Sequence, residues 1–300
     1  RNNRVLIWNS LPVGNTAPDI VLGQEDFYSN NPGTELDQMN WPMDVTTDGE
    51  HVVVADTENN RILIWNTFPT SNGQPADLVI EGDVGISDPK RIIRWPWGVW
   101  ADSGKLVVSS TRASSVLIWN DFPVENNQSA DIYLTAQGDF GTPRGIVSDG
   151  VHLIVGDDNP YGTFFWSSFP TSDDQPYDFF MNGTYGGGQG DFTSDGKLVL
   201  LGEGRFHIWD SFPENSSDLP DLSVGEGDGK PGYRFKKGDG AGVVSAGDRL
   251  YISLTNSNNI VGFNSLPTES MFAPDFAVGA PDICTDTLKT NYFITSPVPV

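Results

Sequence analysis

The chain has 300 residues, of which 17 are basic and 40 are acidic, so its formal net charge is −23. A surface this acidic repels phosphate groups, and nucleic-acid binding depends on Lys and Arg side chains that displace counterions. We therefore expect no nucleic-acid partner. No run of about 18 apolar residues is present, which predicts no membrane insertion. Cys284 is the only cysteine, which excludes an intrachain disulfide.

One short sequence motif recurs six times along the chain: two apolar residues, an aromatic residue, a small polar residue, then a bulky apolar residue and proline. Its aromatic position holds Trp8, Trp65, Trp119, Trp166, Trp209 and Phe263, and its prolines are Pro12, Pro69, Pro123, Pro170, Pro213 and Pro267. Repeats with a period of this size are stacked supersecondary units, each too small to bury its own apolar face. We expect the six aromatic side chains to belong to the core.

In chain order, the first expected strands are 5–8 and 19–22. The next repeat is the clearest, with strands at 43–47, 51–55, 62–65 and 77–80 and a turn at Asp48-Gly49. Later first strands lie near 97–101, 144–148, 190–194, 241–245 and 282–286, and later second strands lie at 105–109, 152–156, 197–201, 249–253 and 291–295. Each fourth strand opens on an aspartate that we expect to accept local backbone hydrogen bonds: Asp19, Asp77, Asp131, Asp178, Asp221 and Asp275.

The two ends of the chain complement each other. The chain begins with a third and a fourth strand and ends with a first and a second strand, which together would make one complete sheet. The sequence therefore predicts an all-β, six-bladed β-propeller with four antiparallel strands per blade and one blade completed by both termini. We expect residues 1–300 to form a single domain.

The clearest repeat resembles the NHL-repeat family of β-propellers. The resemblance lies in Pro42-Met43-Asp44-Val45 and in the segment 53–62, which reads VVADTENNRI. Segment 18–27 is similar to a phrase common in bacterial surface members of that family. Later repeats depart from the pattern, since Ser110-Thr111 stands where Asp56-Thr57 does. The resemblance implies six blades and a surface location, but no single activity, because its members include interaction modules, a lyase and relatives of lactonases.

Three aspartates are candidate metal ligands. First strands line the channel of a propeller, and we expect Asp44, Asp191 and Asp282 at its mouth, with Asp44 and Asp191 in one column of equivalent positions. Converging carboxylates suit a hard cation such as calcium, which takes several oxygen ligands. The alternative is that each carboxylate binds a backbone N–H group or water.

An aromatic and basic group is the candidate ligand-binding surface. Trp41, Trp95 and Trp97 cluster just before two first strands, and Met43 and Arg144 occupy the same channel column as Trp97. Aromatic side chains with an arginine suit a sugar ring, a peptide or a protein anchor. The alternative is packing between blades. Trp41 and Trp95 share one repeat position, so Trp97 and Arg144 are the better functional candidates.

Signatures of common catalytic sites are absent from the sequence. There is no P-loop, no G-x-S-x-G elbow and no histidine pair with zinc-ligand spacing. The leading hypothesis is a non-enzymatic, secreted or cell-surface module that binds a protein or carbohydrate at the channel mouth. The alternative is a calcium-assisted hydrolase or lactonase-like enzyme, in which the metal held by the three aspartates polarises a substrate carbonyl.

Overall fold

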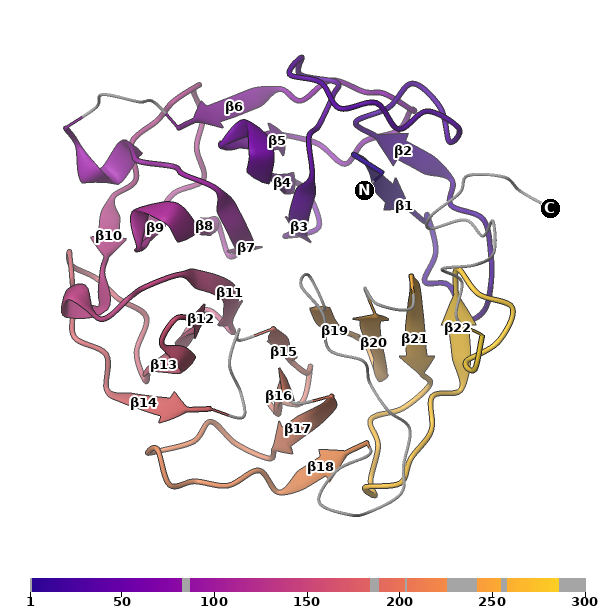
Figure 1. Ribbon diagram of the computed structural model, residues 1–300, viewed down its shortest axis with the longest axis vertical. Helices are drawn as coiled ribbons and strands as arrows, with labels where there is room; N and C mark the ends of the chain where they lie inside the picture. Colours follow the sequence, from indigo (N-terminus) through magenta and orange to yellow (C-terminus); the bar gives the residue numbers. More distant parts are fainter. Residues whose placement is uncertain are drawn as a thin grey trace.

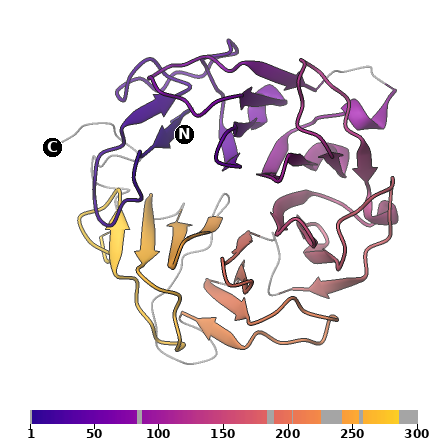
Figure 2. The same ribbon diagram turned by 180° about the vertical axis from the view of Figure 1, so that it is seen from behind.

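The computed structural model describes residues 2–82, 87–183, 189–202, 204–225, 242–254 and 258–285. Within these residues, 22 strands form six antiparallel sheets arranged in a ring around a central channel (Figure 1). Five sheets have four strands and one, β1–β2, has two. The view from behind shows the same ring, with each sheet running outward from the centre (Figure 2). The fold is therefore an all-β propeller, as predicted.

The strands occupy four radial positions. The innermost are β3 (Pro42–Thr47), β7 (Pro96–Asp102), β11 (Pro143–Ser148), β15 (Gly190–Phe192) and β19 (Gly242–Ala246). The second are β4 (Val52–Asp56), β8 (Lys105–Ser110), β12 (Leu153–Asp158), β16 (Leu198–Gly202) and β20 (Arg249–Leu254). The third are β1 (Val5–Ile7), β5 (Arg61–Trp65), β9 (Ser115–Trp119), β13 (Tyr161–Trp166), β17 (Arg205–Trp209) and β21 (Asn259–Phe263). The outermost are β2 (Ile20–Leu22), β6 (Leu78–Glu81), β10 (Ile132–Leu134), β14 (Phe179–Asn182), β18 (Leu222–Val224) and β22 (Phe276–Val278).

Helical structure in the described part of the chain consists of four single turns: η1 (Thr57–Asn59), η2 (Pro89–Arg91), η3 (Thr111–Ala113) and η4 (Ala136–Gly138). None of these helices approaches the length or apolar character needed to cross a bilayer.

The core lies between neighbouring sheets rather than inside any one of them. All residues of β4 and β5 are buried, so these strands are covered on both faces. The repeated aromatic residues are part of this core: Trp65, Trp119 and Trp166 have no exposed surface. The indole Nε1 of each donates to a carbonyl oxygen nine residues further on, at 3.0 to 3.1 Å. The predicted core role is confirmed for these three and for Trp209 and Phe263, whereas Trp8 is only half-buried.

The six repeated aspartates hold the outer two strands of each sheet together. Each carboxylate accepts a hydrogen bond from the backbone N–H of the residue that follows the repeated aromatic. The pairs are Asp19 with Asn9, Asp77 with Asn66, Asp131 with Asn120, Asp178 with Ser167, Asp221 with Asp210 and Asp275 with Asn264, all between 2.6 and 2.8 Å. These aspartates are therefore structural, as predicted.

The strand predicted at 282–286 is wrong over the residues that the structure describes. Residues 281–284 form a turn. The Asp282 carboxylate accepts from the Cys284 backbone N–H at 2.9 Å and from the Thr285 hydroxyl at 3.0 Å, a local bonding pattern that favours a turn over a strand. The second strand predicted at 291–295 lies outside the described residues, as does Ala241.

The two-stranded sheet β1–β2 occupies the position of a sixth blade. On one side, Ile7 and Leu22 share a core cluster with Trp65. On the other side, the Tyr251 hydroxyl donates to the Pro12 carbonyl at 3.1 Å, and the Gly279 N–H donates to Asn15 Oδ1 at 3.1 Å. The ring is therefore continuous through β1–β2.

Two valines beside β1–β2 are more exposed than their counterparts elsewhere. Val45 of β3 is 46% exposed, while Val99 and Ile146, at the same register in β7 and β11, are 4% and 8% exposed. In the sheet on the other side of β1–β2, Val244 of β19 is 52% exposed, while Val147 at the same register in β11 is 1% exposed. Within the described residues, the inner part of this blade position is therefore uncovered.

Candidate functional site

A cavity of about 250 Å³ lies in the channel at the end where the innermost strands begin. Met43 and Asp44 of β3, Trp97 and Gly98 of β7, Gly145 of β11 and Gln189 are among the residues that line it. Gly98 is required by close packing, because a Cβ built there would lie 2.1 Å from the carbonyl oxygen of Arg144. β7 and β11 thus approach each other too closely for a side chain at position 98.

Asp44 uses its carboxylate to join two blades. One oxygen accepts from the Val99 N–H of β7 at 2.9 Å, and the other accepts from the N–H of Val45 at 2.9 Å. Removal of the carboxylate from water raises its pKa to about 7, although these two hydrogen bonds act in the opposite direction. The contacts match the alternative considered above, in which the carboxylate binds backbone N–H groups.

Asp191 has a similar bridging role at a different depth of the channel. Its carboxylate accepts from the Ser245 N–H of β19 at 2.7 Å and from the Ser245 hydroxyl at 3.0 Å. Burial raises its pKa, and hydrogen bonds from Ser245 lower it in part. Thr46, rather than Asp44, holds the same register in β3, and its hydroxyl accepts from the Ala101 N–H of β7 at 3.3 Å. The expectation that Asp44 and Asp191 share one column is therefore wrong.

The three candidate metal ligands are not brought together. Asp44 and Asp191 lie at different levels of the channel, and Asp282 lies in the exposed turn after β22, where a hydrogen bond from Cys284 lowers its pKa. Among the described residues, no group of three or more His, Cys, Asp or Glu side chains is arranged to hold a metal ion. The predicted calcium set is therefore not assembled by this part of the chain.

The three predicted tryptophans do form one cluster at the channel mouth. The ring centroids of Trp41 and Trp95 are 5.5 Å apart, those of Trp95 and Trp97 are 5.1 Å apart, and those of Trp41 and Trp97 are 6.2 Å apart. Edge-to-face contacts at such distances are favourable. The cluster joins the segments that lead into β3 and β7.

Side chains of the preceding blades fix the backbones of Trp41 and Trp95. Both residues adopt left-handed conformations, with φ of 54° and 53°. Asn3 Oδ1 accepts from the Trp41 N–H at 2.9 Å, and Asn60 Oδ1 accepts from the Trp95 N–H at 2.8 Å. The two indoles are thus held in place before any ligand arrives, which lowers the entropic cost of binding.

Two arginines stack on the tryptophan cluster. The Arg144 guanidinium carbon lies 4.1 Å from the Trp97 ring centroid, and that of Arg112 lies 4.3 Å from the Trp95 ring centroid. Arg144 also forms an ion pair with Asp158 at 3.1 Å. Arg144 was predicted from the sequence and Arg112 was not. The sequence marks Arg112 only by its place after Thr111, which Glu58 holds after Thr57 in the preceding repeat.

Exposure within the cluster differs from the expectation. Trp97 is only 3% exposed, so it packs between blades and offers little surface to a ligand. Trp41 and Trp95 are half-buried, and Arg112 is exposed. The residues that can touch a ligand here are therefore Trp41, Trp95 and Arg112, with Arg144 half-buried beside them.

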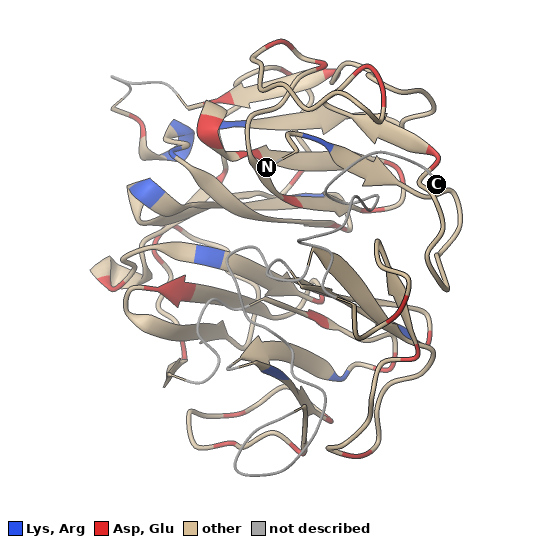
Figure 3. Cartoon of the chain, turned by 45° about the vertical axis from the view of Figure 1, so that its right-hand side comes forward, with Lys and Arg blue, Asp and Glu red and all other residues tan. Residues whose placement is uncertain are grey.

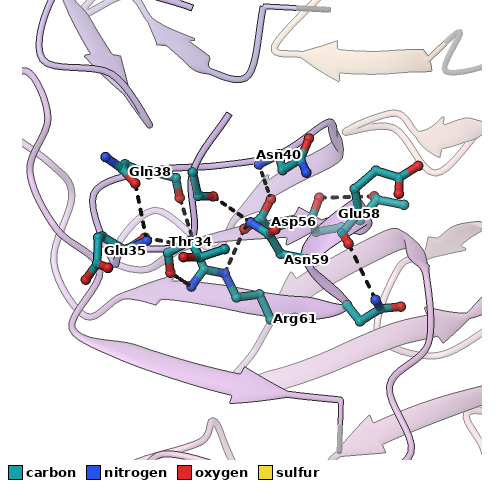
Figure 4. Close-up of polar contacts among 12 residues, drawn as sticks. Thr34, Glu35, Gln38, Asn40, Asp56, Glu58, Asn59 and Arg61 are labelled. Atoms are coloured by element: carbon teal, nitrogen blue, oxygen red, sulfur yellow. Dashed lines mark hydrogen bonds and ion pairs between the residues drawn. The ribbon is translucent and has the colours of Figure 1, made fainter. Parts of the chain in front are cut away.

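A buried ion pair anchors the loop that carries Trp41 (Figure 4). Asp56 accepts from Arg61 Nε at 2.7 Å, from Asn59 Nδ2 at 2.7 Å and from the Asn40 N–H at 2.7 Å. The Arg61 guanidinium also donates to backbone carbonyls of the loop, at Thr34, Glu35 and Gln38. Segment 53–62, which carries the NHL resemblance, therefore holds the loop before β3 in position.

Comparison with known proteins shows the fold alone. No family model matches the chain, and no curated protein matches it. Among solved structures, the chain is similar to a protein of Bacteroides uniformis described as a 6-phosphogluconolactonase, with a TM-score of 0.50, 15% identity and coverage of 82% of this chain and 71% of that chain. A second is a glutaminyl cyclase of Myxococcus xanthus, with a TM-score of 0.40, 16% identity and coverage of 62% of this chain and 70% of that chain. A third is Hsv2p of Kluyveromyces lactis, with a TM-score of 0.43, 11% identity and coverage of 79% of this chain and 71% of that chain. The likeness to the Bacteroides protein agrees with the β-propeller fold described above.

Proposed function

We propose that this protein is a non-enzymatic binding module that recognises its ligand at the channel mouth, through Trp41 and Trp95. The observation that carries the proposal is that both indoles are half-buried, mutually packed and fixed by Asn3 and Asn60. Aromatic side chains held rigidly at a surface are a common basis of recognition, because little conformational entropy is lost on binding. Arg112 and Arg144 add charged hydrogen-bond donors beside the aromatic surface.

A carbohydrate ligand suits this surface better than the alternative of a protein anchor. Pyranose rings present apolar C–H faces that pack on indoles, with hydroxyl groups left for polar neighbours such as Arg112. An NHL-type assignment, supported by the segment 53–62, and a secreted or cell-surface location belong to the same proposal. The hydrolase alternative would need carboxylates that converge on one substrate, and Asp44 and Asp191 each bind backbone N–H groups instead.

We also propose that the ring is completed as a sixth four-stranded blade by the chain that follows residue 285. Support comes from the uncovered Val45 and Val244, which face the inner part of this blade position from both sides. Phe68 adds to this support. Its repeat counterparts Phe122 and Phe212 stack on a histidine of the preceding blade at 4.0 Å, whereas Phe68 is 40% exposed.

The binding proposal is tested by exposing the protein to an immobilised panel of plant, animal and bacterial oligosaccharides. We expect the wild type to bind a subset of the panel, Trp41→Ala to lose that binding, and Trp100→Ala to keep it. Trp100 is the matched control, because it is also a half-buried tryptophan but lies near the end of β7, away from the channel mouth, with its ring centroid 6.0 Å from that of Phe169. Failure of the wild type to bind any glycan, or binding that survives in Trp41→Ala, would contradict the proposal.

A further inference from the structure

We propose that the channel mouth recognises a sugar that carries a single carboxylate, with Arg112 as the residue that binds the anion. This inference rests on the proposed function and specifies the chemical class of its ligand. The sugar ring would pack against Trp41 and Trp95, and its carboxylate would accept hydrogen bonds from the edge of the Arg112 guanidinium.

The first observation concerns Arg94 and Arg112, two arginines at the mouth of a strongly acidic protein. Arg94 and Arg112 are exposed and adjacent, since the Arg112 N–H donates to the Arg94 carbonyl at 3.1 Å. Within the described residues, neither forms an ion pair, although the chain has 40 acidic residues for 17 basic ones. Acidic and basic segments of the molecule are shown in Figure 3, where the basic ones are few.

The second observation is that Arg112 is positioned before a ligand binds. Its guanidinium carbon lies over the Trp95 ring, 4.3 Å from the ring centroid, and a guanidinium held over an aromatic ring keeps its in-plane N–H groups available. Such a fixed fork matches the two oxygens of a carboxylate. Glu58, which holds the repeat position of Arg112 in the preceding blade, accepts from Trp95 Nε1 at 3.4 Å.

The net charge of the protein limits the charge of the ligand. With a net charge of −23, the molecule repels polyanions over a distance of about 8 Å, the Debye length at physiological salt. A chain with a carboxylate on every sugar would experience that repulsion along its whole length. One acidic sugar at the mouth meets the local field of Arg94, Arg112 and Arg144, in which Asp158 offsets Arg144 and Glu58 lies beside Trp95.

The test compares methyl β-D-glucuronide with methyl β-D-glucoside, which differ in the carboxylate at C6. Dissociation constants are measured by titration NMR on the wild type, Arg112→Gln and Arg249→Gln. We expect the glucuronide to bind the wild type at least about tenfold more tightly than the glucoside, as one charge-assisted hydrogen-bonded pair provides. Arg112→Gln should remove that preference. Arg249→Gln should retain it, because Arg249 begins β20 at the other end of the channel.

Each result separates this inference from the proposed function. Equal affinities of the two glycosides for the wild type, both lost in Trp41→Ala, would overturn the carboxylate inference and leave the binding module in place. A glucuronide preference that persists in Arg112→Gln would overturn the role of Arg112. Absence of binding by either glycoside, together with a panel that shows no bound glycan, would overturn both proposals. Arg112 is exposed, so we expect Arg112→Gln to fold normally, and an unchanged Tm checks this.

Discussion

Asp44 makes the stability of the protein depend on pH in a direction opposite to that of ordinary acidic residues. Its pKa is raised from 3.8 to about 7, mainly because the carboxylate is removed from water between β3 and β7. In the unfolded chain the carboxyl group loses its proton near pH 4, whereas in the folded chain it keeps the proton to about pH 7. The stability that Asp44 contributes is therefore fully present below pH 4 and is lost as the pH rises to about 7.

The size of this effect follows from the shift. The difference between 3.8 and about 7 is about 3 pKa units. At 1.36 kcal/mol per unit, this corresponds to at most about 4 kcal/mol. Asp44 as a residue is half-buried, so water screening reduces the value. Between pH 5 and pH 7 alone, where most other carboxylates are already ionised, we expect a change of about 1–3 kcal/mol.

The assay compares wild type with Asp44→Asn by urea unfolding at pH 5, 6, 7 and 8. Asparagine has nearly the same shape and does not titrate, so the difference between the two proteins isolates Asp44 from the other acidic groups. We expect the free energy of unfolding of the wild type to fall relative to that of Asp44→Asn from pH 5 to pH 7, and then to level off. A difference that is constant over this range, or that rises with pH, would refute the assignment of a raised pKa to Asp44.

Three further predictions concern the architecture. Gly98→Ala should prevent folding or lower the free energy of unfolding by several kcal/mol, because the alanine Cβ would lie 2.1 Å from a backbone carbonyl oxygen of β11. Gly14→Ala, with open space around it, should leave the Tm unchanged. Equal melting temperatures of the two variants would contradict this prediction. Trp119→Ala should lower the free energy of unfolding by about 3–5 kcal/mol in urea unfolding, and a loss below about 1 kcal/mol would refute its place in the core. If a sixth blade is complete, Val45→Asp should lower the free energy of unfolding by more than about 2 kcal/mol, measured by the same method. Val151→Asp, at an exposed site, should change it by no more than about 0.5 kcal/mol. A Val45→Asp variant as stable as the wild type would contradict a complete sixth blade.

The repeated features were predictable from sequence because six copies meet the same physical requirement. Every copy of the third strand places an aromatic where neighbouring sheets pack, and every copy of the fourth strand places an aspartate where a backbone N–H needs an acceptor. Recurrence at fixed positions therefore identified structural residues such as Trp119 and Asp131.

The positions of the channel carboxylates were not predictable, because the length of a hairpin turn shifts the register of the strand before it. Asp48-Gly49 follows the last paired residue of β3, Thr47, directly, whereas Thr193 and Ser194 separate the last paired residue of β15, Phe192, from Asp195-Gly196. These two additional residues place Asp191 two register positions away from Asp44. An alignment by residue count therefore put the two aspartates in one column.

Contacts between blades were also beyond the reach of the sequence. His51 and His152 share one repeat position, which the sequence presents as a polar strand end. In the structure their rings stack on Phe122 and Phe212 of the next blade at 4.0 Å. Within one blade, the stacking of Arg112 on Trp95 was equally unpredictable, because it joins the segment before β7 to the turn between β8 and β9.

The most direct test of ligand recognition at the channel mouth uses the nine tryptophans of the chain as reporters. With ¹⁵N-labelled indoles, each assigned by a single Trp→Phe variant, methyl β-D-glucuronide is titrated into the wild-type protein. The account predicts that the indole N–H signals of Trp41 and Trp95 shift with a common saturation curve, while that of Trp100 stays in place. Signal shifts confined to Trp100 would contradict this prediction. So would the absence of signal shifts at Trp41 and Trp95 when a glycan that binds on the immobilised panel is titrated instead.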